Sequence, residues 1–327
     1  MRKLLLILLC VPMMFSCLEN NNTENTQNNV VLDDIPEKED RNSLLWKIEK
    51  DDEISYLFGT THIMCEDQMK YTDLLDALVQ EVDVIVYESD DNEMMGQDPM
   101  PYGKGVFGID IPESYKMKNI FSNADIDYYK DYWNSINIDG SVVDILINTD
   151  VISAAFIEAS FMMYNVDCET TGSEIYLEEI NDGKDEFFLE NIPEIKNVFT
   201  SWINYTYDNI DFSIYDVESA IQFNIETYSD VALLNDMNNY NNNDPQADYD
   251  DMMSMADPSD PNFETYKVLF EGLDGFLIQE RNEMWMPRII NIMNDDKALF
   301  AVGALHVLDL VERLEKEGYT LTPLDIK

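Results

Sequence analysis

Histidine is almost absent from this chain, whose 327 residues include only His62 and His306. Cations are scarce too, because 20 lysines and arginines stand against 66 aspartates and glutamates, which gives a formal net charge of −46. Nucleic-acid binding depends on lysine and arginine neutralising phosphates, so this balance excludes a nucleic-acid partner. The acidic excess instead indicates a solvated surface that keeps the protein soluble, and it would attract divalent cations.

Cysteine is also rare, and beyond the first 17 residues the chain carries only Cys65 and Cys168. Two cysteines do not make the disulfide framework of a small secreted scaffold. They either form one disulfide or stay free and buried, and the sequence leaves both states open.

The apolar stretch that starts at Leu4 is too short to cross a bilayer comfortably. It follows two cations and leads to Cys17, which is the arrangement of an export signal. The tract MFSC matches a bacterial lipobox imperfectly, because that motif carries an aliphatic residue three positions before the cysteine. We interpret residues 1–17 as a lipoprotein-type signal peptide with Cys17 lipidated, and ordinary cleavage nearby is the alternative. The protein would then be exported and anchored to a membrane of a bacterial cell envelope.

Apolar periodicity is missing from residues 18–42, which are rich in asparagine and acidic residues. Such a segment cannot bury enough surface to offset its ordering entropy, so we predict a flexible tether. Folding signals begin at residue 43. Because the whole chain is 45% hydrophobic and 11% aromatic, residues 43–327 are long enough and apolar enough to form one large domain with a full core.

Strand patterns gather at the two ends of this domain. Two apolar runs flank the charged turn KDDE as in a hairpin, and a helix pattern over 71–82 with a buried strand after it suggests parallel pairing through a right-handed crossover. A second helix pattern, over 307–318, precedes the last strand. The strands predicted at the two ends cover residues 44–49, 54–60, 82–89, 297–306 and 319–324.

The middle of the chain, from about residue 91 to 294, has mainly helical patterns. One run inside it, DEFFLENI at residues 185–192, is typical of a strand that returns to the sheet. Residues 233–263 are rich in Asn, Asp and Pro, so we expect a mobile loop with one short helix. The predicted fold class is therefore α/β, with a mixed sheet built from both chain ends and a helical insertion in the middle.

Both histidines stand three residues after a glycine, at the end of an apolar strand pattern and before a helix-like segment. His62 and His306 should therefore lie at the carboxyl edges of strands, where ligands bind in open α/β sheets. Glycine lets the backbone turn closely there, and neutral imidazole is a common metal ligand. The alternative is that each histidine is an ordinary strand-end residue with a structural role.

Two glutamates have the same setting, because Glu88 ends the run VIVYES and Glu190 lies in FFLENI. An ionised carboxylate there would be costly if it were buried without a partner. Beside two imidazoles it can ligate a divalent ion or act as general base on a bound water. Arg281 in QERNEMW can orient a carboxylate or polarise a carbonyl. For all three residues the alternative is a surface position.

The stretch GKGVFG, residues 103–108, fits the glycine spacing of a dinucleotide-binding loop. It follows a loop and leads into IDIPE, whereas that fingerprint needs a strand before it and a helix that starts on it. We therefore do not predict nucleotide binding.

Several motifs in order carry a resemblance to one family: YLFGTTH, VIVYES, FFLENI, ERNEMW and AVGALHVLDL with the Gly-Tyr that follows it. They resemble the TraB/GumN/Tiki family, whose hallmarks are two Gly-x-x-His motifs near the ends, a glutamate after the following strand and a Gly-Tyr before the last strand. The resemblance runs from about Ser43 to Leu324. The Asn-rich part of the middle departs from the family, so substrate-binding residues cannot be transferred.

The resemblance implies a core like that of erythromycin-esterase and ChaN-type proteins, with a metal-dependent hydrolase site. Animal Tiki members are membrane-anchored peptidases that use manganese or cobalt, and bacterial TraB-like members are linked to shutting down a peptide pheromone. Carried over by position, the family's histidine pair, its two glutamates and its Arg-Asn pair fall on His62, His306, Glu88, Glu190, Arg281 and Asn282.

We therefore predict an exported, lipid-anchored metallohydrolase that cleaves a peptide or protein substrate. A divalent ion, Mn, Co or Zn, would be held by His62, His306 and one or both of Glu88 and Glu190, and the uncoordinated carboxylate would take the proton of the attacking water. Arg281 and Asn282 would complete the catalytic set. The alternatives are a lipoprotein on the same fold that binds a peptide or other ligand without turnover, and an esterase-like activity.

Overall fold

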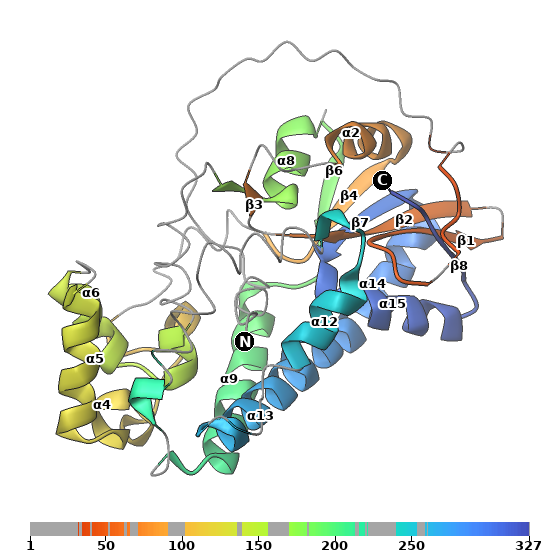
Figure 1. The fold of residues 1–327 in the computed structure, drawn as a ribbon. Coiled ribbons are helices and arrows are strands. Elements are labelled where there is room, and N and C mark those ends of the chain that lie inside the picture. Colours follow the sequence, from red (N-terminus) through yellow and green to blue (C-terminus); the bar gives the residue numbers. More distant parts are fainter. Residues whose placement is uncertain are drawn as a thin grey trace.

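Strands from both ends of the chain, and one from its middle, form one six-stranded sheet in the computed structural model (Figure 1). In spatial order the strands are β6 (Asp185–Phe188), β4 (Val84–Tyr87), β7 (Ala298–Gly303), β2 (Glu53–Thr60), β1 (Leu45–Lys50) and β8 (Thr320–Pro323). The strands from β6 to β2 are parallel neighbours, and β1 pairs antiparallel with both β2 and β8. This confirms the predicted α/β class, and it confirms that the two ends of the chain share one sheet.

The structure describes residues 32, 35–39, 41–51, 53–61, 64–65, 71–90, 102–135, 139–155, 170–181, 183–212, 216–219, 221, 240–253, 259 and 261–326. None of the helices in these parts of the chain is long and apolar enough to cross a membrane.

Both faces of the sheet are buried at β1, β2, β4 and β7, because neighbouring residues along each of these strands belong to different core clusters. Phe58 and Ala301 pack into one cluster, whereas Leu57 and Phe300 pack into the other. Parallel strands with both faces covered read as continuous apolar runs, as β7 does. The helices that cover the sheet or extend from it are α2 (Thr72–Glu81), α8 (Ser173–Ile180), α9 (Ile192–Asn209), α12 (Pro245–Met253), α13 (Phe263–Gly272), α14 (Arg281–Asp295) and α15 (Ala304–Lys316).

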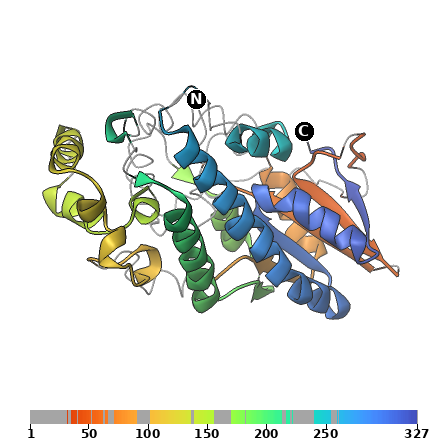
Figure 2. The same ribbon diagram turned by 90° about the horizontal axis from the view of Figure 1, so that it is seen from below.

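One long helical segment runs from the start of α13 to the end of α14, and its middle, η6 (Leu273–Glu280), is a π-helix. It lies beside α9, as Figure 2 shows. Apolar residues of η6 belong to one core cluster and those of α14 to the other. The segment therefore passes from one face of the sheet to the other at the edge where the parallel strands end.

A small helical unit stands apart from the sheet and has its own core (Figures 1 and 2). It contains α4 (Met117–Ile120), α5 (Asn123–Ser135) and α6 (Gly140–Ile147), and its centre is Trp133, which is fully buried. This unit lies in the predicted insertion. The strand predicted for the run DEFFLENI is confirmed, because β6 follows this unit in the chain and forms one edge of the sheet.

The strand predicted over 297–306 is wrong at its end, because β7 stops at Gly303 and α15 begins at Ala304. Gly303 is the extended N-cap of this helix (φ −50°, ψ 139°), and the alanine and leucine after it favour helix. His306 thus lies in the first turn of a helix. That turn still starts at the carboxyl edge of β7, where we expected the histidine.

The Asn-rich stretch 233–263 contains the expected short helix, α12, but its described part is not a loose loop. Tyr240 and Asn243 are buried. The Asn243 side-chain oxygen accepts from the backbone N–H of Leu44 and the hydroxyl of Ser43, and its amide nitrogen donates to the carbonyl of Leu324. Asparagine tolerates the left-handed backbone found there, with φ +58°.

Contacts with the sheet begin before residue 43, where we expected the domain to start. Glu37 forms a β-bridge with Leu324, and the N–H of Lys38 donates to the carbonyl of Pro323 at 2.9 Å. Residues 35–39 therefore lie along the outer edge of β8. The rest of the predicted tether and the predicted signal peptide lie almost wholly outside the described residues.

Candidate active site

Glu88 and Glu190 lie side by side at the carboxyl edge of the sheet. The backbone ladder between β4 and β6 continues past the strands, because the N–H of Glu190 donates to the carbonyl of Glu88 at 2.8 Å. Both residues are buried, with exposed fractions of 6% and 3%. The backbone N–H of Gly303 donates to Glu88 Oε1 at 2.6 Å, so the end of β7 also contacts this carboxylate.

Arg281 joins the two carboxylates. Its Nη2 donates to Glu88 Oε2 at 2.6 Å and to Glu190 Oε1 at 2.5 Å, and its Nε lies 3.1 Å from both oxygens of Glu190. Arg281 is the first residue of α14, directly after the π-helix η6. Such π segments occur frequently at functional sites, because they shift the side chains that follow them relative to a regular helix.

His306 completes the cluster and is fully buried. Its Nε2 lies 3.2 Å from Nη1 of Arg281 and 3.7 Å from Oε1 of Glu88. The ring of Trp285 packs against the imidazole, with 4.5 Å between ring centroids. The three sequence-predicted residues Glu88, Glu190 and Arg281 thus meet His306 in one buried cluster.

Asn282 contacts the other nitrogen of the imidazole. Its Oδ1 lies 2.8 Å from Nδ1 of His306, and its Nδ2 donates to Asp309 at 2.8 Å and to the His306 carbonyl at 3.2 Å. An amide oxygen only accepts hydrogen bonds, so Nδ1 carries the proton. In the neutral imidazole the lone pair is then on Nε2, the nitrogen that faces Arg281 and Glu88.

Two residues that contact Glu190 or its neighbours in the chain were not predicted from the sequence. Trp285 Nε1 donates to Glu190 Oε2 at 3.1 Å. Arg288 donates to the carbonyl of Leu189 and, through both Nη atoms, to the two carboxylate oxygens of Glu194. Their spacing in the sequence could have identified them, because Arg281, Trp285 and Arg288 stand at i, i+4 and i+7 and so share one helix face.

The two Gly-x-x-His motifs begin on neighbouring parallel strands, with Thr60 of β2 opposite Gly303 of β7. Gly59 is needed for close packing, because a Cβ there would lie 2.8 Å from Leu44 Cδ2 and 3.1 Å from the Cα of Ala304. The described part of the first motif ends at Thr61. Both motifs therefore leave the sheet at the same edge.

The electrostatics of the cluster are set by burial. Burial raises the pKa of Glu190, the charge and hydrogen bonds of Arg281 lower it, and the nearby charge of Glu88 raises it further. Two carboxyl groups, one guanidinium and one imidazole thus share one buried site. An ionised group is costly in such a place unless it has a partner, which is why the contacts with Arg281 matter for both carboxyl groups.

His62, Cys17 and Cys168 lie outside the described residues. The backbone of Cys65 is in β3 (Met64–Cys65), which pairs with β5 (Thr170–Thr171). Within the parts of the chain that the structure covers, no group of three or more His, Cys, Asp or Glu side chains is arranged to hold a metal ion.

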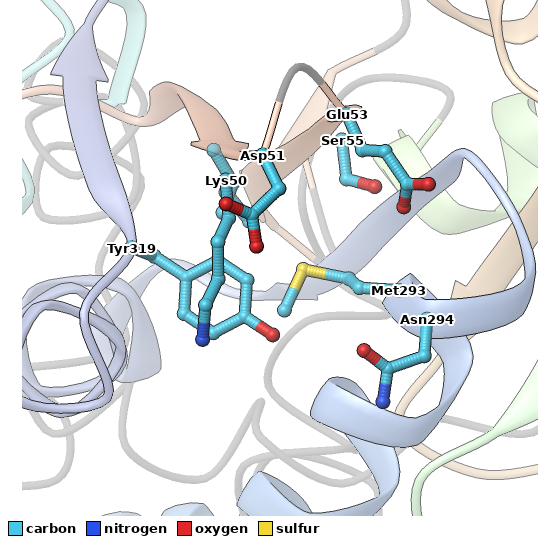
Figure 3. Close-up of a pocket in the computed structure, with 8 residues that line it drawn as sticks. Lys50, Asp51, Glu53, Ser55, Met293, Asn294 and Tyr319 are labelled. Atoms are coloured by element: carbon cyan, nitrogen blue, oxygen red, sulfur yellow. The ribbon is translucent and has the colours of Figure 1, made fainter.

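A hollow of about 200 Å³ lies at the opposite edge of the sheet, below the turn between β1 and β2 (Figure 3). Lys50 extends over the ring of Tyr319, with Nζ 4.2 Å from the ring centroid. The hollow is lined by Ile48, Lys50, Asp51, Glu53, Ser55, Met293, Asn294 and Tyr319. None of these residues belongs to the cluster around Glu88 and His306, so this hollow is separate from the candidate active site.

A family model described as the TraB/PrgY/gumN family matches residues 44–323. This match spans the whole sheet and every residue of the cluster described above. No curated protein and no solved structure matches the chain.

Proposed function

We propose that this chain, which belongs to the TraB/PrgY/gumN family, is an exported, lipid-anchored, metal-dependent hydrolase that cleaves peptides. The observation that carries the proposal is the buried cluster of Glu88, Glu190, Arg281 and His306, in which Nε2 of His306 lies 3.7 Å from Oε1 of Glu88. Imidazole and carboxylate are ligands that divalent ions of this kind bind in proteins.

Two donor atoms of the cluster lie close enough together to bind one ion. Two ligand atoms, each about 2.0–2.2 Å from a metal ion, lie at most about 4.4 Å apart. His306 Nε2 and Glu88 Oε1 are separated by 3.7 Å, which is within that limit. The lone pair of the neutral imidazole is also on Nε2, because Nδ1 donates to Asn282. His306 and Glu88 are therefore close enough to share a metal ion, which would replace Nη1 of Arg281 as the partner of Nε2. His62 is the further ligand that the family resemblance implies.

Glu190 fits a different role. Both of its oxygens accept hydrogen bonds from Arg281, and Oε2 accepts a further one from Trp285. We therefore assign Glu190 as the counter-ion that fixes Arg281, and we do not include it among the metal ligands. From the sequence we expected one or both glutamates to bind the ion, and we propose Glu88 alone.

When bound, the ion would supply a Lewis acid and an acidified water for hydrolysis. Arg281 would orient the substrate, since its guanidinium is held from two sides and can polarise a carbonyl at the strand edge. His306 would stay neutral and keep its orientation through Asn282. Trp285 would shield the imidazole from water.

The test is a peptide-library digest by the full chain in the presence of Mn²⁺ or Co²⁺. The variant Glu88→Gln distinguishes a metal ligand from a general base. We expect cleavage by the wild type and loss of both metal and cleavage in Glu88→Gln, because Glu88 is assigned as a ligand. If the variant keeps its metal but loses cleavage, Glu88 is instead the base. If the wild type binds metal and cleaves no peptide, the hydrolase proposal fails.

One observation favours a second function, ligand binding without turnover. The Arg281 guanidinium already lies between the two carboxylates, and its Nη1 is 3.2 Å from His306 Nε2. Because Arg281 already pairs with both carboxylates, the site is held together without a metal ion, and a ligand could bind at the sheet edge without being hydrolysed. Binding of library peptides that is unchanged by a chelator, with no cleavage in any metal, would favour this second function.

A further inference from the structure

A chain of hydrogen bonds leads from the imidazole of His306 to the outer side of α15. Asn282 contacts His306 through Oδ1 and Asp309 through Nδ2, each at 2.8 Å. Asp309 Oδ2 also accepts from Nε of Arg313 at 2.6 Å. The imidazole and the amide at the inner end are fully buried, whereas Asp309 and Arg313 at the outer end are partly exposed.

Asp309 determines which way the Asn282 amide points. An amide group has one end that donates and one that accepts. The two acceptors on one side are Asp309 Oδ2 and the carbonyl of His306, and the carbonyl is the more distant at 3.2 Å. With Nδ2 turned toward them, Oδ1 must face Nδ1 of the imidazole.

Arg313 holds Asp309 in turn. The two residues are four positions apart on α15, so their side chains meet on one helix face. Nη2 of Arg313 also donates to the carbonyl of Gln279 at 3.3 Å, in the π-helix just before Arg281. Arg313 therefore ties Asp309 and α15 to the segment that supplies Arg281 and Asn282.

We propose that Asp309 and Arg313 are positioning residues that fix the Asn282 amide and, through it, the tautomer of His306. They keep the proton on Nδ1 and the lone pair on Nε2, toward Glu88 and Arg281. The tautomer is a property of the metal-free protein, and only the effect on metal affinity rests on the proposed function. Partners of this kind, which orient a ligating histidine from outside, typically change metal affinity 10- to 100-fold when they are lost.

The test compares Asp309→Ala with Asp309→Asn in the metal-free full chain, by the ¹⁵N spectrum of the imidazole nitrogens at a pH where His306 is neutral. His306→Gln identifies the His306 signals. Glu312→Ala is the matched control, because this residue is on the same helix and is 71% exposed in an ion pair with Lys316. Affinity for Mn²⁺ and Co²⁺ is measured on the same samples, and circular dichroism checks that each variant is folded.

In the wild type we expect the protonated nitrogen to be Nδ1. Asp309→Ala should give a mixture of tautomers and roughly tenfold weaker metal binding. Without Asp309, the Asn282 amide rotates in a fraction of the molecules, so that Nδ2 faces the imidazole in place of Oδ1. Asp309→Asn should stay close to the wild type, since its side-chain oxygen can accept from both Asn282 and Arg313. Glu312→Ala should match the wild type in both measurements.

The proposal is overturned if folded Asp309→Ala keeps the wild-type tautomer, or if Asp309→Asn shifts it as much as Asp309→Ala does. A wild type that binds neither metal, combined with a shifted tautomer in Asp309→Ala, contradicts the proposed metal-dependent function and leaves the positioning role intact. Metal binding by the wild type with no shift in Asp309→Ala contradicts the positioning role alone.

Discussion

Arg281 and Glu190, 91 residues apart in the chain, form an ion pair whose side chains are 5% and 0% exposed. The same guanidinium reaches Glu88, so one arginine at the start of α14 holds the carboxylates that follow two neighbouring parallel strands. An ion pair this deeply buried adds little net stability by itself, but removing one partner leaves an uncompensated charge in the interior. The burial of both carboxylates at the carboxyl edge of the sheet therefore depends on Arg281 of α14.

Arg281→Met should destabilise the protein by about 3–5 kcal/mol, because it leaves both carboxylates buried without their cation. The measurement is the urea unfolding midpoint at pH 7. Lys316→Met is the control, since Lys316 is exposed in a surface ion pair worth less than about 1 kcal/mol. Equal midpoints for the two variants would show that Arg281 does not stabilise the buried carboxylates.

Gly59→Ala should cost about 1–3 kcal/mol through overpacking, because the added methyl group would lie 2.8 Å from Leu44 Cδ2 and 2.9 Å from Val307 Cγ2. Gly275→Ala is the matched control. A Cβ at Gly275 meets nothing within 4 Å, and alanine favours helix over glycine by up to about 1 kcal/mol. Thermal unfolding of the two variants should therefore shift in opposite directions, and a shift of the same sign and size in both would contradict this packing.

Asp150→Asn should stabilise the protein at neutral pH. Asp150 is fully buried, burial raises the pKa of its carboxyl above the ordinary 3.8, and its Oδ1 accepts from the N–H of Ser153 at 2.9 Å. Asparagine can accept the same hydrogen bond without a charge. Because folding raises this pKa, the carboxyl group is protonated in both the folded and the unfolded protein below pH 3.8 and does not lower the stability there. As the pH rises from 3.8 toward the folded pKa, the free energy of unfolding falls.

Unfolding midpoints from pH 3 to pH 7 test this sign. The gain from Asp150→Asn should be absent at the acid end and grow with pH. Asp139 is an exposed N-cap whose carboxyl pKa is lowered by its hydrogen bond to Ser141, so Asp139→Asn should show the opposite trend. A gain from Asp150→Asn that does not change with pH would mean that the buried carboxyl is not the cause.

Cys17→Ser should release the protein from the membrane fraction after export, because the variant lacks the thiol that a lipid would modify. The measurement is the distribution of the full chain between membrane and soluble fractions, with Cys10→Ser as the control inside the leader. Detection of the wild type only in the soluble fraction would exclude the anchor.

The sheet could be predicted from the sequence because its strands carry strong local patterns. The β1–β2 hairpin is marked by apolar runs around a charged turn, and β7 is a continuous apolar run. The end of β7 could not be predicted, because strand and helix compete for the residues from Gly303 to His306. Pattern alone does not show that Gly303 caps a helix there.

The cluster was predicted only in part, for a physical reason. Glu88, Glu190 and Arg281 were found because strand ends and motifs mark them. Trp285 orients Glu190 and Asp309 orients Asn282, and these partners lie 95 and 27 residues apart in the chain. Tyr240 was missed for the same reason, since it stands in a polar run and donates to the carbonyl of Gly59 across 181 residues.

The most direct test of the central claim is the metal content of the full chain, expressed and purified without a chelator or a metal-affinity step, beside that of His306→Gln. We expect about one manganese, cobalt or zinc ion per wild-type chain and none in the variant, because His306 would lose its metal-binding nitrogen. Circular dichroism and the unfolding midpoint should show that the variant is folded. Equal metal content in both proteins, or none in a wild type incubated with Mn²⁺ and Co²⁺, would contradict a metal site at His306.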